Sequence, residues 1–213
     1  MKNNHRYPIF LDLRGVKCLV VGGGPVALRK VVGLRQAGAE VFVNSPEITT
    51  SLRVLADKKA ITWIDKKYSP ARLQGMRLVI AATNNAEVNH AVFIDAEKRG
   101  LFSNVVDDLD YCRFVAPARY SGGSLEIAVT TGGAAPVIAK IVRDDIGDNI
   151  GNRYAPVVSL LGKRRLAIKR LSAEAKKAFW QRVKTVVKTT KPGEAISLKK
   201  LDALLADMAG GSA

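Results

Sequence analysis

Three short stretches of this sequence combine residue types that could bind an anion or move a proton. The first contains Gly22, Gly24 and Ala27, which have the spacing of a turn that brings the backbone close to a pyrophosphate. The second ends in Asp107, a carboxylate that follows Asn-Val-Val, precedes another acid and could act as a general base. The third, Thr131-Gly132-Gly133, precedes a proline and would present amides and a hydroxyl at a helix start. Each pattern also forms ordinary turns, so the surrounding elements decide its meaning.

The first glycine stretch lies between a predicted strand and a predicted helix. An apolar run over residues 17–21 enters it, and residues 26–37 leave it with helical periodicity. Gly22 would permit the tight turn, and Gly24 would let the backbone approach a phosphate. Pro25 suits the first helical turn, where no amide hydrogen is needed. This context favours a dinucleotide-binding site over a plain turn.

The end of the second predicted strand bears on which dinucleotide binds. Many dinucleotide folds end this strand with Asp or Glu, which holds the ribose hydroxyls. Here the strand predicted over residues 40–45 ends in Asn44-Ser45-Pro46-Glu47. Asn44, Ser45 or Glu47 could bind the ribose, and each could equally be a turn or cap residue. These residues leave the choice between NAD and NADP open.

The alternation of strands and helices predicts an α/β fold with a Rossmann-type doubly wound parallel sheet. We expect strands at residues 17–21, 40–45, 60–64, 77–82 and 101–106, and helices at 26–37, 50–59 and 86–99. Thr83 follows the fourth strand, at the end of a parallel sheet where cofactors bind. It would also suit a cap of the next helix, and the two roles are compatible.

The rest of the chain changes character. Strands predicted over residues 114–118 and 125–130 would form a small sheet, followed by a helix over 137–145. Helical segments are then expected up to residue 171, from 173 to 187 and from 197 to 208. The fold is thus a Rossmann-type sheet, a small α+β segment and a helical C-terminal domain.

Composition and charge limit the partners. The chain has 213 residues, of which 47% are hydrophobic, and a net charge of +15. That charge indicates an acidic partner, unless the basic residues only solvate the surface. Cys18 and Cys112 provide no disulfide framework, and with His5 and His90 they show no metal-ligand spacing, so we predict no resident metal. Without a signal-peptide core or a run near the roughly 20 apolar residues of a membrane span, we expect a cytoplasmic protein without a membrane partner.

With these elements in place, the sequence resembles the siroheme synthase N-terminal family. Its members are precorrin-2 dehydrogenases, and some are also sirohydrochlorin ferrochelatases. The resemblance covers residues 7–146. Some members carry a fused methyltransferase module that this sequence does not show, so the sequence resembles the stand-alone form. It rests on these segments, in family order: Tyr7-Pro-Ile-Phe10, Leu19-Val-Val-Gly-Gly-Gly-Pro-Val-Ala-Leu-Arg-Lys30, Ala81-Ala-Thr-Asn84, Asn104-Val-Val-Asp107, Phe114-Val-Ala-Pro117 and Thr130-Thr-Gly-Gly-Ala-Ala-Pro136.

The resemblance implies an NAD-binding Rossmann domain over residues 1–113, a dimerisation segment over 114–150 that builds a homodimer, and a helical domain over 151–213. Asp107 falls on the family's catalytic aspartate, and Thr131 on a serine close to the tetrapyrrole. Ala135 departs from the family, where a serine often stands, so a hydroxyl contact is in doubt there. The positions that fall on NAD contacts are Pro25, Val26, Pro46 and Glu47.

The implied reaction is oxidation of precorrin-2 to sirohydrochlorin, with NAD accepting a hydride and Asp107 accepting a proton. Precorrin-2 is a polycarboxylate, so a basic chain with amides at Gly132 and Gly133 suits it. Iron insertion, with Fe(II) as a substrate, is left open. The alternative is an NAD-sensing or nucleic-acid-binding regulator with a Rossmann domain and a basic helical tail, although the resemblance argues against nucleic acid.

Overall fold

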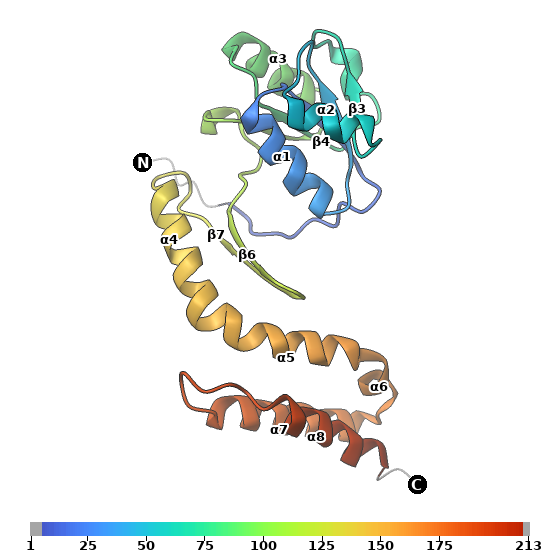
Figure 1. Ribbon diagram of the computed structural model, residues 1–213, viewed down its shortest axis with the longest axis vertical. Coiled ribbons are helices and arrows are strands. Elements are labelled where there is room, and N and C mark those ends of the chain that lie inside the picture. Colours follow the sequence, from blue (N-terminus) through green and yellow to red (C-terminus); the bar gives the residue numbers. More distant parts are fainter. Residues whose placement is uncertain (1–5, 211–213) are drawn as a thin grey trace. The chain divides into compact units, whose positions relative to one another are not determined.

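The computed structural model describes residues 6–210 and divides into two compact units, one ending at Ala116 and one beginning at Pro117 (Figure 1). His5 and the first residues of the segment inspected for a signal peptide lie outside the described residues.

The first unit contains a five-stranded parallel sheet in the order β3-β2-β1-β4-β5. This order confirms the predicted doubly wound fold, since the chain reverses direction across the sheet between β1 and β4. The strands β1, β2 and β4 are built mainly from buried apolar residues, as expected for a parallel sheet covered on both faces. The strands are β1 (Lys17–Val21), β2 (Glu40–Asn44), β3 (Thr62–Ile64), β4 (Leu78–Ala81) and β5 (Phe102–Val105).

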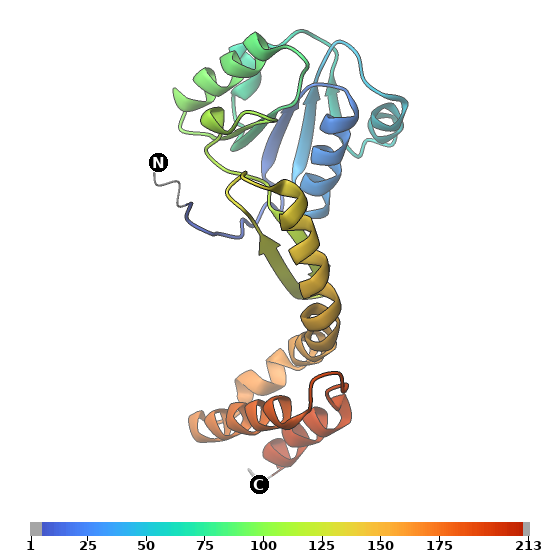
Figure 2. The same ribbon diagram turned by 90° about the vertical axis from the view of Figure 1, so that its left-hand side faces the viewer.

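Helices cover both faces of this sheet, because side chains alternate along each strand. In β1, Cys18 and Val20 pack with α1 (Pro25–Gln36) and α2 (Thr50–Asp57), whereas Leu19 and Val21 pack with α3 (Ala86–Glu97). Figure 2 shows α1 and α3 on opposite sides of the sheet. Two short 3-10 helices, η1 (Pro70–Leu73) and η2 (Leu109–Tyr111), complete the unit. The carboxyl ends of the strands therefore meet at one edge between two helical layers.

The second unit begins with a hairpin of β6 (Ala118–Gly122) and β7 (Leu125–Val129). The prediction of a strand over residues 114–118 was wrong. The Phe114 amide donates to the carbonyl of Ser103, its carbonyl accepts from Asn104, and Pro117 has no amide hydrogen for a ladder. The tight connection between β6 and β7 falls at Gly123, whose φ of 62° suits a two-residue hairpin loop.

A continuous helical rod follows the hairpin, made of α4 (Pro136–Ile146), the π-helical turn η3 (Gly147–Gly151) and α5 (Asn152–Lys163). Tyr120 of β6 lies against η3, where a Cβ on Gly147 or Gly151 would overlap its ring. Its hydroxyl also donates to Asn152 Oδ1 over 3.2 Å. The expected break after residue 145 is therefore wrong, because the ring fits against two glycines in a wider helical turn. The predicted domain boundary at residue 150 falls inside this rod.

The remaining helices form the core of the second unit with α5. Phe179, Val183 and Leu201 are buried there. The single helix expected up to residue 171 is interrupted at Arg164, which separates α5 from α6 and binds Asp202 through both carboxylate oxygens. Within residues 6–210 no helix is both long and apolar enough to cross a membrane. The helices are α6 (Arg165–Arg170), α7 (Ala173–Thr189) and α8 (Leu198–Gly210).

Candidate functional site

The glycine turn after β1 is held by backbone contacts from two neighbouring strands. The Gly22 amide donates to the Asn44 carbonyl over 3.0 Å, and a Cβ on Gly22 would overlap the Ala82 carbonyl oxygen. A Cβ on Gly23 would overlap the Glu47 carbonyl oxygen. Beside Gly24, by contrast, no atom of the described chain lies within 4 Å of such a Cβ. The turn is therefore closed against the protein at its first two glycines and open at the third.

This turn lines a cavity of about 1040 Å³, large enough for a dinucleotide. The cavity reaches from the end of β2 across the β4–α3 connection to α3. Pro25 and Val26 are absent from its lining and instead form the first turn of α1. The predicted cofactor residues that line the cavity are Gly22, Gly24, Asn44, Ser45, Pro46, Glu47 and Thr83.

The start of α1 suits the pyrophosphate of a dinucleotide. Gly24 is the N-cap and Pro25 the first helical residue, and no side chain caps the first-turn amides. These amides and the helix dipole favour an anion. The open space beside Gly24 gives that anion room to approach. The residues at the start of α1 therefore fit the pyrophosphate of a dinucleotide.

At the end of β2, the predicted ribose-binding residues have different environments. Asn44 is 1% exposed, and its Nδ2 donates to the carbonyls of Ile64 (3.2 Å) and Lys66 (2.5 Å). Its Oδ1 is buried without a partner among the described residues. Asn44 therefore ties the β2 and β3 ends together, whereas Ser45 is partly exposed and Glu47 exposed. A ribose would meet Ser45 and Glu47 more readily than the Asn44 amide.

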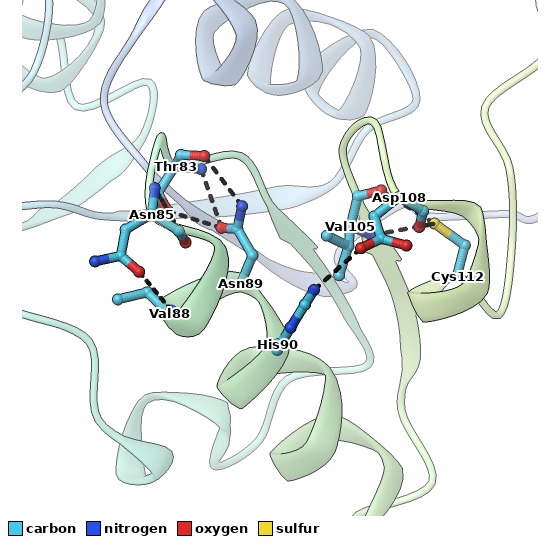
Figure 3. Close-up of polar contacts among 8 residues, drawn as sticks. All are labelled: Thr83, Asn85, Val88, Asn89, His90, Val105, Asp108 and Cys112. Atoms are coloured by element: carbon cyan, nitrogen blue, oxygen red, sulfur yellow. Dashed lines mark hydrogen bonds and ion pairs between the residues drawn. The ribbon is translucent and has the colours of Figure 1, made fainter.

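Thr83 and Asn85 fix the loop after β4 (Figure 3). The Thr83 amide and hydroxyl both donate to Asn89 Oδ1, over 3.2 and 2.7 Å, and Asn89 Nδ2 donates to the Thr83 carbonyl over 3.0 Å. Asn85, rather than Thr83, caps α3 by accepting from the Val88 amide. Thr83 thus combines a place in the cavity wall with a role in shaping its loop.

Asp107 follows β5 by two residues and does not line this cavity. Its side chain is exposed. Its φ of 62° lies in the left-handed region, which a non-glycine residue enters at a cost. Burial lowers the pKa of Lys30, assisted by the charge of Arg29 and opposed by Cys112 and Asp107. The lysine on α1 therefore lies within electrostatic reach of the carboxylate.

The sequence reasoning did not assign roles to the residues of α3 and η2 around Asp107. His90 Nε2 lies 3.0 Å from Asp108 Oδ2, and the ring stacks on Tyr111 at a centroid distance of 3.9 Å. The Cys112 thiol donates to the carbonyls of Val105 and Asp108, both over 3.1 Å. The one sequence signal for a special role in α3 was Asn89, because asparagine is unfavourable in the interior of a helix and this residue lies in the middle of a predicted one.

A second missed feature is the far wall of the cavity. The Tyr68 hydroxyl donates to Asp95 Oδ2 over 3.1 Å, and both residues line the cavity with Lys67. Burial and the neighbouring Asp95 raise the pKa of Tyr68, so this hydroxyl keeps its proton. No signal within either segment reveals this pair, because 27 positions separate the two residues.

The predicted substrate-binding turn lies in the second unit. Gly132 has a φ of 65° and Gly133 of 92°. The Gly132 amide donates to Thr130 Oγ1, and the Ala135 amide donates to Thr131 Oγ1, both over 3.1 Å. The Gly132 amide is therefore already in an exposed hydrogen bond to a neighbouring hydroxyl. The Gly133 amide has no such partner within the described part of the chain.

No group of three His, Cys, Asp or Glu side chains in residues 6–210 is arranged to hold a metal ion. The parallel sheet, the glycine turn at its switch point and the adjoining cavity instead define a Rossmann-type dinucleotide-binding protein.

Comparisons with known proteins agree with this class. The family described as "Putative NAD(P)-binding" matches residues 9–118, and the family described as "Sirohaem biosynthesis protein central" matches residues 123–149. The chain belongs to the siroheme synthase N-terminal family, as its sequence motifs predict. The match supports a nicotinamide dinucleotide as cofactor.

Curated relatives and one solved structure extend the match. Siroheme synthase of Chromobacterium violaceum is 42% identical over 179 residues, which are 83% of this chain and 38% of that protein. Siroheme synthase of Nitrosococcus oceani is 39% identical over 178 residues, again 83% of this chain and 38% of that protein. The chain thus spans well under half the length of these relatives. The solved structure of SirC, precorrin-2 dehydrogenase, aligns with a TM-score of 0.80 and 27% identity, covering 96% of this chain and 100% of that one.

Proposed function

We propose that the protein oxidises precorrin-2 to sirohydrochlorin with NAD as hydride acceptor. The observation that carries the proposal is the alignment with SirC, precorrin-2 dehydrogenase, over that protein's full length. The glycine turn and its cavity support the cofactor part. The family's catalytic aspartate position, occupied by Asp107, supports the chemical part.

The chain's own residues would divide the work. The nicotinamide, when bound, supplies the hydride acceptor. The first-turn amides of α1 hold the pyrophosphate, and the Asp107 carboxylate accepts the proton that leaves with the hydride. Lys30 on α1 is the basic residue within electrostatic reach of this carboxylate that the structure identifies. The net charge of +15 attracts a polycarboxylate substrate, and Thr131, Gly132 and Gly133 form the turn offered to it.

The charge at the end of β2 supports NAD rather than NADP as the proposed cofactor. Glu47 is exposed in the cavity lining, where its carboxylate would repel a 2′-phosphate. Lys67 also lines the cavity and would reduce that repulsion, so the preference is a matter of degree. Measuring kcat/KM with NAD and with NADP tests this preference. We expect a higher value with NAD, and Glu47→Gln should have a smaller ratio of the NAD value to the NADP value than the wild type.

A homodimer is part of the proposal because α4 exposes apolar side chains. Val137 is 67% exposed, and Ile138 and Ile141 are each 50% exposed. Such residues along one helix are typical of a protein interface. Sedimentation equilibrium should find a dimer that Ile138→Lys weakens. A wild-type chain that stays monomeric across micromolar concentrations would contradict this part.

The decisive experiment uses Asp107→Asn, because asparagine also enters the left-handed region while lacking the negative charge. Anaerobic incubation with precorrin-2 and NAD should produce NADH and sirohydrochlorin with the wild type. Asp107→Asn should lower kcat by about 100-fold or more with an unchanged Kd for NAD. Asp57→Asn, at the exposed last residue of α2, is the control and should retain activity.

Two further arms separate the remaining activities. Supplying sirohydrochlorin and Fe(II) as substrates tests iron insertion, which some family members perform. Measuring duplex DNA binding across salt concentrations tests the regulator alternative, which requires steep salt dependence without precorrin-2 turnover.

The reducing cytoplasm is the location that we propose for this protein. Both cysteines are free and buried, which is in keeping with that location.

A further inference from the structure

We propose that Asn89 and His90, adjacent residues of α3, are positioning residues that hold the two loops flanking the reaction in register. The cofactor loop is residues 82–85, and the acid loop is residues 106–110. The inference rests on the proposed function for its kinetic consequences. Since β4 and β5 pair in parallel, both loops leave the same edge of the sheet. Neighbouring side chains on a helix point about 100° apart, so one turn of α3 can reach both loops.

The Asn89 carboxamide supplies the cofactor loop with hydrogen bonds of the kind that another backbone segment would otherwise make. The residue is 7% exposed and exchanges hydrogen bonds with the amide, hydroxyl and carbonyl of Thr83. A carboxamide can accept and donate at once, which neither a carboxylate nor an apolar side chain can do. Because Thr83 lines the cavity, a shift of this loop would move part of the cofactor wall.

The His90 ring performs the corresponding task for the acid loop, and Figure 3 shows its contact with Asp108. Its Nε2 pairs with Asp108, and stacking on Tyr111 fixes the plane of the ring. Phe93, also on α3, packs edge-on against Tyr111 at 5.2 Å between ring centroids. His90 therefore contacts the acid loop at Asp108 and, one residue beyond the loop, the last residue of η2, Tyr111.

The acid loop needs such support because Asp107 is held in the left-handed region. A non-glycine residue stays in that region only when its surroundings determine its conformation. Asp108, the next residue, is held twice: its side chain pairs with His90, and its carbonyl accepts from the Cys112 thiol. His90 and Cys112 thus act on the Asp107 carboxylate through its neighbour Asp108.

A kinetic test separates the role of Asn89 from that of His90. His90→Phe keeps a flat ring against Tyr111 but loses Nε2, so kcat should fall about tenfold with the Kd for NAD unchanged. His90→Gln, which keeps a nitrogen near that position, should restore most of the loss. Asn89→Ala should raise the Kd for NAD about tenfold and change kcat at saturating NAD less. Ile94→Ala, at an exposed position of α3, is the control for a general effect on the helix.

Hydrogen exchange supplies a readout that does not depend on turnover. His90→Phe should speed exchange in the acid loop alone, and Asn89→Ala in the cofactor loop alone. Asn89→Asp, which keeps the acceptor and loses the donor, replaces Asn89→Ala if that variant does not fold. Variants that change both loops equally, or neither, overturn the inference. A wild type that binds NAD but leaves precorrin-2 unchanged would instead refute the proposed function, while exchange and NAD titration still decide the positioning roles.

Discussion

The two glycine turns, after β1 and after β7, look alike in sequence and are built differently. Each precedes a proline that begins a helix, α1 in one unit and α4 in the other. In the first turn, Gly22 and Gly23 are required because backbone carbonyls lie where a Cβ would be. In the second turn, Gly132 has open space around it, and Thr130 and Thr131 hydroxyls accept the neighbouring amides.

The difference shows two ways in which a glycine turn can serve a site. The turn after β1 gains its shape from strands far along the chain, so its free amides can point at a ligand. The turn after β7 satisfies much of its own hydrogen bonding and depends on glycine mainly for positive φ. Substitutions should therefore be severe in the first turn and mild in the second.

The largest effect is expected for Gly23→Ala. Its methyl group would overlap the Glu47 carbonyl oxygen, and the backbone on both sides would have to move. We expect the first unit to lose about 3 kcal/mol or more of unfolding free energy, and NAD binding with it. Trp63 and Trp180 are the chain's two tryptophans and lie in different units, so single-tryptophan variants report each unit's unfolding. Equal destabilisation of both units would contradict this assignment.

The next effect is a pH dependence that only the first unit should show. Burial raises the pKa of the Cys18 thiol in β1 to about 11. Above pH 9 the unfolded thiol loses its proton while the folded one keeps it, so the folded state binds more protons and stability falls as pH rises to 11. The loss should approach roughly 3 kcal/mol. Denaturant unfolding of wild type and Cys18→Ala measures it: the variant should lose this part of the pH slope in the first unit.

Gly24→Ala sharpens the contrast within the first turn. Apart from its chain neighbours, no atom of residues 6–210 lies within 4 Å of the added Cβ, so the thermal midpoint should stay unchanged. The methyl group would stand where the pyrophosphate approaches, and the Kd for NAD should rise about tenfold. Calorimetric titration and a thermal melt measure the two quantities. Unaltered NAD affinity would show that the dinucleotide does not pass over Gly24.

The sequence predicts the first unit better than the second for a physical reason. Successive side chains of a strand point to opposite faces of the sheet, as Cys18 and Leu19 do, and this pattern depends only on neighbouring residues. The burial of Asn44 depends on the Lys66 carbonyl, and the continuous rod depends on Tyr120 meeting two glycines. These contacts join distant segments, so no local pattern announces them.

The candidate site divides in the same way. Gly22, Glu47 and Thr83 could be found from their positions at strand ends, a rule of the fold. The roles of Asn89 and His90 require knowing which loops α3 faces, which only the assembled sheet determines. The aspartate was located by its motif, whereas its left-handed backbone could not be read from the residues around it.

Substitutions in the turn after β7 should cost less stability than Gly23→Ala does in the first turn. Gly132→Ala must keep a φ of 65°, which costs an alanine about 1–2 kcal/mol. Thr130→Val removes the hydroxyl that accepts the Gly132 amide and should cost about 1 kcal/mol or less, because the residue is exposed and water can replace it. Trp180 fluorescence in denaturant should register both losses in the second unit, while NAD affinity stays at the wild-type value. A Thr130→Val loss as large as that of Gly23→Ala would mean that the second turn, like the first, is held by contacts beyond its own residues.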